Sequence, residues 1–146
     1  MHVFAGEIAR GLLGGEIFGL QGDLGTGKTE FVRGLAQALG SRDAVKSPSF
    51  TLLNLYRTTH PTIKHLIHVD LYRLDKLGTD PNTDVLEQIG LDEWFPADGR
   101  TGGRDDVVIV IEWPELLSQD LSKMRQLKFS YGELESDRLV VDEREA

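Results

Sequence analysis

The sequence predicts an α/β domain built around a mixed central sheet, and three observations support this. A short apolar strand is expected over Glu16–Leu20, and it leads into a glycine-rich turn. Apolar residues then recur at helical spacing over Lys28–Leu39. Val107–Ile111 is an unbroken apolar run, typical of a strand buried on both faces. We expect a single domain over residues 1–146, because that length is usual for one hydrophobic core.

Two predicted hairpins make the sheet mixed rather than wholly parallel. Phe50–Arg57 and Lys64–Leu71 are rich in strand-forming residues, and the turn residues His60-Pro61 lie between them. Gln126–Ser130 and Arg138–Val141 are expected to form the second pair of strands.

Shorter elements are predicted from local signals. Glu7–Leu13 is expected to form a first helix that ends at Gly14-Gly15. Asp84 is expected to cap a short helix over Val85–Ile89, because its carboxylate can accept from free N–H groups of the first turn. Leu91–Phe95 is expected to add another short helical piece.

Composition excludes several classes of function. The chain has no cysteine, which rules out a disulfide scaffold, a thiolate metal site and a cysteine nucleophile. Its net charge of −8 makes it a poor candidate for holding nucleic acid by itself, because that task needs a basic surface facing the phosphates. No run of 18 apolar residues occurs, so no membrane span is predicted. The first residues lack the basic and apolar regions typical of a signal peptide.

The strongest functional signal is Gly22–Thr29, which matches the pattern G-x-x-x-x-G-K-S/T in full. A backbone can wrap closely around phosphates only where bulky Cβ groups are absent, and three glycines supply that freedom. The helix that begins here adds its free N–H groups and the positive end of its dipole. The pattern places the ammonium of Lys28 against the β and γ phosphates and the hydroxyl of Thr29 on Mg²⁺. We therefore expect ATP and Mg²⁺ to bind at this loop.

A site for a magnesium nucleotide also needs a carboxylate, usually at the carboxyl end of a buried strand. Glu112 directly follows the long apolar run, and Asp70 ends the second strand of the first hairpin. The alternative for each is a strand-end carboxylate that only caps a turn. The independent phosphate-loop signal favours a place in the site for both residues.

Aromatic and histidine residues near these strand ends are less informative. Trp113 is equally consistent with a place beside the nucleotide and with a place in the core. His65 and His68 lie three positions apart, so they face opposite sides of a strand. His68 shares a face with Asp70, but two ligands do not make a zinc site, and no histidine metal site is expected.

Four motifs, taken together in this order, resemble the bacterial TsaE family, also called YjeE. They are GDLGTGKT, SPSF, HVDLYRL and EWPE, and the resemblance covers about residues 5–130. This family consists of small ATPases of the tRNA threonylcarbamoyladenosine pathway. The resemblance implies a P-loop NTPase-like three-layer α/β domain with a mixed, largely parallel central sheet.

The resemblance also implies roles for the matching residues. It makes Thr29 and Glu112 the magnesium ligands and Asp70 the essential acidic residue, and it places Lys28, Asp70 and Glu112 in the catalytic centre. Ser47–Phe50 matches a switch-like loop, with serine at position 49 where the family commonly has threonine. The implied nucleotide-binding residues are Gly22, Asp23, Gly25, Thr26, Gly27, Lys28, Thr29, Glu30 and Trp113.

Partners follow from the same resemblance. TsaE-like proteins bind the TsaD–TsaB complex, and their ATP hydrolysis supports transfer of the threonylcarbamoyl group to adenosine 37 of tRNAs that read codons beginning with A. We therefore expect a cytoplasmic protein that is monomeric in isolation and contacts tRNA only through the complex. No arginine of this chain is clearly placed to act as an arginine finger, which stabilises the charge of the transition state. We therefore expect ATP hydrolysis to be slow in the isolated protein and faster with the partner complex.

Two alternatives remain open. A small-molecule kinase also has a phosphate loop but usually carries an arginine-rich lid, for which Arg100–Arg104 is the only candidate. A nucleotide-dependent switch without hydrolysis is the other.

Met1-His2-Val3 stands where the family often has a threonine near the adenine, so the sequence does not predict which residues contact the base.

Overall fold

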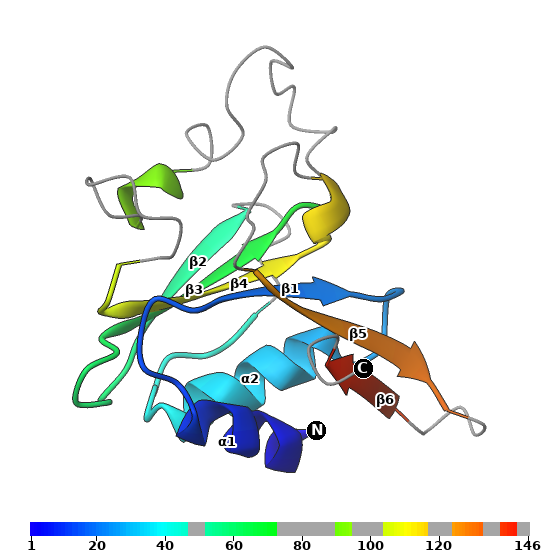
Figure 1. Ribbon diagram of the computed structural model, residues 1–146, viewed down its shortest axis with the longest axis horizontal. Coiled ribbons are helices and arrows are strands. Elements are labelled where there is room, and N and C mark those ends of the chain that lie inside the picture. The colour runs from blue at the N-terminus through cyan, green and yellow to red at the C-terminus, as the bar shows by residue number, and fades with distance from the viewer. Residues whose placement is uncertain (47–51, 73–89, 95–103, 117–123, 133–137, 143–146) are drawn as a thin grey trace.

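A six-stranded sheet forms the centre of the computed structural model, which describes residues 1–46, 52–72, 90–94, 104–116, 124–132 and 138–142 (Figure 1). The strand order across the sheet is β2-β3-β4-β1-β5-β6. The strands are β1 (Ile17–Gln21), β2 (Leu53–Arg57), β3 (His65–Asp70), β4 (Val107–Glu112), β5 (Arg125–Tyr131) and β6 (Arg138–Asp142).

The four central strands run parallel and the two edge strands run antiparallel to their neighbours. β1 pairs in parallel with both β4 and β5, and β3 pairs in parallel with β4. β2 is antiparallel to β3, and β6 is antiparallel to β5. Both predicted hairpins are therefore confirmed, and so is the mixed, largely parallel sheet.

Two helices cover one face of the sheet, α1 (His2–Arg10) and α2 (Lys28–Ala38) (Figure 1). Strand residues alternate between the two faces. Phe18, Leu66 and Val110 point toward the helices, whereas Ile67 and Ile109 belong to a second buried cluster on the opposite face. The second cluster is covered in part by the 3₁₀ helices Asp92–Trp94 and Pro114–Leu116, which lie across the sheet from α1 and α2 (Figure 1). The sheet is thus the middle of three layers.

The first helix differs from its prediction, which was Glu7–Leu13. It begins at His2 and ends at Arg10, with Gly11 following as the C-cap residue. Ala5 and Ile8 are buried in the cluster that also contains residues of α2. The helix therefore extends toward the N-terminus because α2 offers an apolar surface there, which the local sequence does not reveal.

Other predicted elements agree with the structure or fall outside it. The segment predicted over Leu91–Phe95 contains a 3₁₀ helix at Asp92–Trp94. The predicted Asp84 cap with its helix Val85–Ile89 lies outside the described residues, as does Ser47–Phe50. In the part of the chain that the structure describes, neither helix has the length and hydropathy needed to cross a bilayer.

Gly34 allows α1 to pack closely against α2. A Cβ at this position would lie 2.9 Å from the Cβ of Ala5 and 3.2 Å from the Cα of His2. Overpacking of this kind costs about 1–3 kcal/mol, more than the roughly 1 kcal/mol that alanine gains over glycine in a helix.

We predict that Gly34→Ala lowers the free energy of unfolding by up to about 2 kcal/mol, as measured by urea denaturation followed by circular dichroism. Gly6→Ala is the matched control, because a Cβ at Gly6 meets no atom within 4 Å. This control is expected to raise the free energy of unfolding by about 0.5–1 kcal/mol. Equal stabilisation by both substitutions would show that a methyl group at position 34 fits between α1 and α2 without cost.

Candidate functional site

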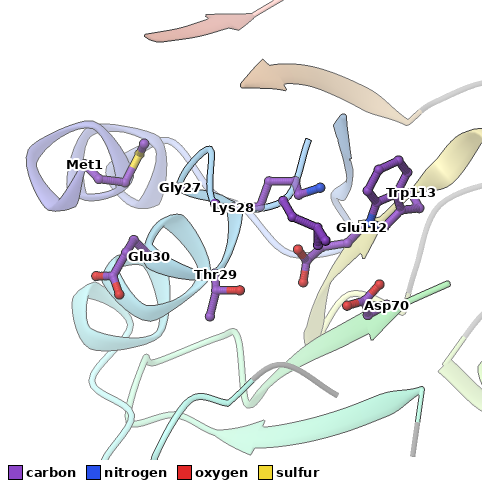
Figure 2. A pocket seen from close by; sticks show the side chains of 10 residues that line it. Met1, Gly27, Lys28, Thr29, Glu30, Asp70, Glu112 and Trp113 are labelled. Carbon is purple, nitrogen blue, oxygen red and sulfur yellow. The ribbon is translucent and has the colours of Figure 1, made fainter. Parts of the chain in front are cut away.

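A pocket of about 290 Å³ lies at the carboxyl ends of the parallel strands, where α2 begins (Figure 2). The ends of β1, β3 and β4 meet at this edge, which is the place where open α/β sheets bind ligands. The pocket is lined by Met1, Leu24, Gly25, Gly27, Lys28, Thr29, Glu30, Asp70, Glu112 and Trp113.

The loop between β1 and α2 depends on glycine at three positions. Gly22, Gly25 and Gly27 have φ values of 147°, 78° and 105°, a region that residues with a Cβ rarely adopt. A Cβ at Gly22 would also lie 2.5 Å from the carbonyl oxygen of Phe129 on β5. Gly27 is the N-cap residue of α2, so the free N–H groups of the first helical turn open onto the pocket.

Lys28 is buried at the centre of the pocket, with 4% of its surface exposed. Its ammonium donates to the carbonyl of Gly22 and lies 4.1 Å from the centroid of the Trp113 ring (Figure 2). Burial lowers the pKa of Lys28 below its ordinary value, and the nearby carboxylates of Glu112 and Asp70 oppose that shift. An anionic ligand in the pocket would therefore meet a poorly solvated cation, for which it would be a strong partner.

The two predicted carboxylates lie side by side. Asp70 and Glu112 are the last residues of β3 and β4, and they are register partners in the parallel ladder. Both are largely buried, with 9% and 3% of their surfaces exposed. Thr29, in the first turn of α2, points its hydroxyl toward the same space (Figure 2).

The donor set fits magnesium better than zinc. Thr29 and Glu112 offer a hydroxyl and a carboxylate, which are oxygen ligands of the kind that Mg²⁺ prefers. The described residues contain no group of three histidine, cysteine, aspartate or glutamate side chains suited to a metal ion. Mg²⁺ needs no such cage, because it usually keeps several waters and takes phosphate oxygens as ligands.

Sequence reasoning gave His68 no role, yet the structure places it against Glu112. Its Nε2 lies 2.6 Å from Oε2 of Glu112, and both side chains are buried. The signal was present in part, since His68 and Asp70 were expected to share one face of a strand. The sequence does not specify the register between β3 and β4. In the structure Asp70 pairs with Glu112, and this register brings His68 beside the Glu112 carboxylate.

Trp113 follows Glu112 with an unusual backbone conformation. Its φ of 61° is uncommon for a residue with a side chain, and such a conformation costs on the order of 1–3 kcal/mol. The backbone N–H of Trp113 donates to the Leu20 carbonyl at 3.2 Å, and the indole ring packs against the Tyr72 ring with centroids 5.1 Å apart. These contacts direct the indole into the pocket, beside the Lys28 ammonium.

We predict that nucleotide binding changes the fluorescence of Trp113, because phosphates that attract Lys28 draw its ammonium away from the indole ring. The chain has two tryptophans, so Trp94→Phe leaves Trp113 as the single reporter. Titration of that variant with ATP is expected to give a saturable change in emission. Trp113→Phe, in which Trp94 alone reports, is expected to give none. A change that survives only in Trp113→Phe would contradict this assignment.

Several predicted loop residues shape the site without lining the pocket. Gly22 accepts the hydrogen bond from Lys28, and the buried Thr26 donates through its hydroxyl to the Asp23 carbonyl at 2.7 Å. Leu24 lines the pocket although it was not among the predicted site residues, and so does Met1, which belongs to the segment whose contact with the base was left open. Met1 reaches it because α1 packs along α2 and brings the start of the chain to the end of the pocket opposite Trp113 (Figure 2).

The parallel sheet, the glycine loop and the lysine at the start of α2 together define an α/β domain of the P-loop class. The family model described as "Threonylcarbamoyl adenosine biosynthesis protein TsaE" matches residues 1–141, and the chain belongs to this family. The resemblance inferred from the four sequence motifs is therefore confirmed.

Curated relatives agree with the family model. Proteins named "tRNA threonylcarbamoyladenosine biosynthesis protein TsaE" from Aquifex aeolicus and Bacillus subtilis are 40% and 35% identical over 130 and 111 residues. These alignments cover 85% and 76% of this chain. The chain spans 86% of the Aquifex relative but only 58% of the Bacillus relative. A relative of the same name from Synechocystis is 37% identical over 113 residues, which is 77% of this chain and 63% of that protein.

Proposed function

We propose that this protein binds ATP with Mg²⁺ and hydrolyses it slowly, as the ATPase subunit of a machinery that forms threonylcarbamoyladenosine at position 37 of tRNA. One observation carries the proposal. Lys28 and Thr29 at the start of α2 share a single pocket with the strand-end carboxylates of Asp70 and Glu112.

Binding of the triphosphate is assigned to the loop and the start of α2. The N–H groups of the first helical turn and the positive end of the helix dipole favour an anion at this position. Lys28 adds a buried ammonium, and charge-assisted hydrogen bonds to phosphate are about twice as strong as neutral ones. The loop does not determine where the adenine binds; Met1 and Leu24 are the apolar side chains that line the pocket in addition to Trp113.

Hydrolysis requires neutralised phosphate charge and an oriented water. Thr29 and Glu112 would hold Mg²⁺, which supplies positive charge at the phosphate oxygens when bound. Lys28 supplies the protein's own positive charge. Asp70 is held beside Glu112 and accepts the Tyr72 N–H at 3.0 Å through Oδ1, a contact that fixes the carboxylate. We assign Asp70 the task of orienting the attacking water.

Slow turnover in isolation is part of the proposal. Lys28 is the only cationic side chain among the described residues that line the pocket, and none of them is an arginine. P-loop ATPases and GTPases without an arginine finger hydrolyse slowly until a partner supplies one, or supplies equivalent charge stabilisation. A fast basal rate in the purified protein would contradict this part of the proposal.

The pathway comes from the family and from the relatives, whose names describe tRNA threonylcarbamoyladenosine biosynthesis. We propose that TsaD and TsaB form the partner complex, that tRNA is met only through this complex, and that the work takes place in the cytoplasm. The net charge of −8 supports an indirect role toward tRNA. A monomeric free state and a single domain over the whole chain complete the proposal.

Reconstitution of tRNA modification over many turnovers tests this function, with phosphate release measured in parallel. Wild type with TsaB and TsaD is expected to sustain modification and to release phosphate faster than wild type alone. Asp70→Ala is expected to bind ATP but to stop both processes. Glu7→Ala, which removes an exposed carboxylate on α1 that does not line the pocket, is the matched control and is expected to behave as wild type.

The two alternatives give different results in the same experiment. Modification that depends on ATP binding without phosphate release would identify a switch that does not hydrolyse. Phosphate transferred to a small molecule instead of water would identify a kinase. Of the candidate lid Arg100–Arg104, only Arg104 is among the described residues; it forms an ion pair with Asp106 at 2.9 Å, beside the first residue of β4, whereas the pocket lies at the last residue of that strand.

A further inference from the structure

We propose that His68 is a positioning residue that orients the Glu112 carboxylate for the divalent cation, and that Tyr56 holds His68 in place. This inference rests on the proposed function, since it assigns how one magnesium ligand of that same site is held. Neither side chain lines the pocket, so both would act through Glu112.

The contact between His68 and Glu112 is short and fully desolvated. The ring of His68 is 0% exposed, Glu112 is 3% exposed, and Nε2 lies 2.6 Å from Oε2. An ionised carboxylate only accepts hydrogen bonds, so the Nε2–H must donate. Among the described residues, His68 is the one hydrogen-bond donor to this carboxylate, through Oε2, which leaves Oε1 available on a side chain that lines the pocket. One oxygen is therefore fixed by the protein while the other is presented to a ligand.

The sheet makes this geometry rigid. His68 pairs with Val110, and Asp70 pairs with Glu112, so His68 is a diagonal neighbour of Glu112 on the same face of β3 and β4. β3 lies between β2 and β4, with hydrogen-bonded ladders on both sides. The ring thus approaches the carboxylate from a strand that has little freedom to move.

Tyr56 extends this polar network beyond His68. Its hydroxyl lies 3.4 Å from Nδ1 of His68 and 3.0 Å from the carbonyl oxygen of Lys46, and its single proton can be donated to one of these two acceptors at a time. The same hydroxyl accepts the Lys46 N–H and a side-chain N–H of Asn54, each at 3.3 Å. Tyr56 is itself buried, with 3% of its surface exposed. A continuous polar network therefore joins the Glu112 carboxylate to the backbone of Lys46.

A purely structural explanation is the competing account. A buried histidine needs a hydrogen-bond partner, and Glu112 would serve as one even without a metal. In that account, loss of His68 lowers stability and leaves the metal affinity of the folded protein unchanged. Partners that orient metal ligands behave differently, because their loss typically weakens metal binding by about 10- to 100-fold.

The test measures Mn²⁺ affinity by electron paramagnetic resonance of the free ion, at saturating ATP, with ATP affinity in the absence of metal measured by calorimetry. His68→Leu is expected to weaken Mn²⁺ binding by about 10- to 100-fold while metal-free ATP affinity stays within about twofold. His68→Gln is expected to recover much of the Mn²⁺ affinity, because its side-chain N–H can take the place of the Nε2–H.

His65→Leu is the matched control. His65 lies on the same strand but faces the opposite side of the sheet, where its ring packs against Trp94 at 5.5 Å. It is expected to leave Mn²⁺ affinity unchanged. Equal Mn²⁺ affinity in wild type and folded His68→Leu would overturn the inference, as would His68→Gln binding no better than His68→Leu.

Tyr56→Phe keeps the inference testable if His68→Leu does not fold. It retains the ring and removes only the hydroxyl, and it is expected to weaken Mn²⁺ binding by about threefold to tenfold, less than loss of the direct partner. Unchanged affinity in this variant would then overturn the inference. Failure of wild type to bind Mn²⁺ with ATP would overturn the proposed function as well, whereas equal binding by wild type and the variants overturns the positioning role alone.

Discussion

Replacing Lys28 by alanine is expected to weaken ATP binding by at least about 100-fold. Hydrogen bonds to charged groups contribute about 1.5–3 kcal/mol each, and 1.4 kcal/mol corresponds to a tenfold change in affinity. Lys28 has the single cationic side chain among the described residues that line the pocket, so no neighbouring side chain there can replace it. Its burial adds to the effect, because a desolvated ammonium interacts more strongly with phosphate than one in water.

Calorimetric titration with ATP and Mg²⁺ measures this loss directly. Lys64→Ala is the matched control, since Lys64 is exposed, does not line the pocket, and donates through its ammonium to the carbonyls of His60 and Pro61. The control is expected to bind ATP as wild type does. Circular dichroism must show that Lys28→Ala is folded. A folded Lys28→Ala protein that binds ATP within a fewfold of wild type would remove Lys28 from the phosphate site.

Replacing Glu112 by glutamine is expected to abolish the effect of Mg²⁺ on ATP binding and hydrolysis. The substitution preserves shape, and the amide oxygen can still accept from His68, but the negative charge that attracts the cation is lost. We expect Mg²⁺ to raise the ATP affinity of wild type by about tenfold and that of the variant not at all, since a tenfold change in affinity needs only 1.4 kcal/mol. Phosphate release is expected to fall to the level that wild type shows in EDTA.

Glu115→Gln provides the control for the charge change itself. Glu115 lies in the 3₁₀ helix that follows β4, is exposed, and does not line the pocket. Because it changes the net charge by the same amount close to the site, it separates long-range electrostatics from metal ligation. A Mg²⁺ effect that persists in Glu112→Gln, or disappears equally in Glu115→Gln, would contradict the assignment of Glu112 as a ligand.

Much of the fold could be predicted because its signals are local. The glycine loop, the apolar run at Val107–Ile111 and both hairpins are encoded by turn residues and strand-forming residues close together in the sequence. The start of α1 was predicted five residues late, because the apolar partner of Ala5 and Ile8 is the remote helix α2. A glycine inside a helix indicates either a weak position or a close packing contact, and the structure shows that Gly34 makes a close contact with α1.

The residues of the candidate site could be predicted from the sequence, but the contacts between them could not. The loop pattern and the strand-end positions identified Lys28, Thr29, Asp70 and Glu112, and the structure brings these residues into one pocket. The contact of His68 with Glu112 depends on the register between β3 and β4, which no single strand specifies. The same holds for the left-handed backbone of Trp113, which the surrounding contacts impose against its own preference.

The central claim is that the loop Gly22–Thr29 and the two strand-end carboxylates form one site for ATP and a divalent cation. A crystal structure of the protein with a non-hydrolysable ATP analogue and Mn²⁺, with the metal located by its anomalous signal, tests this claim most directly. The account predicts the triphosphate against the start of α2 and a single Mn²⁺ that contacts the hydroxyl of Thr29 and the carboxylate of Glu112. Nucleotide bound elsewhere on the protein, or an Mn²⁺ ion that contacts neither residue, would contradict it.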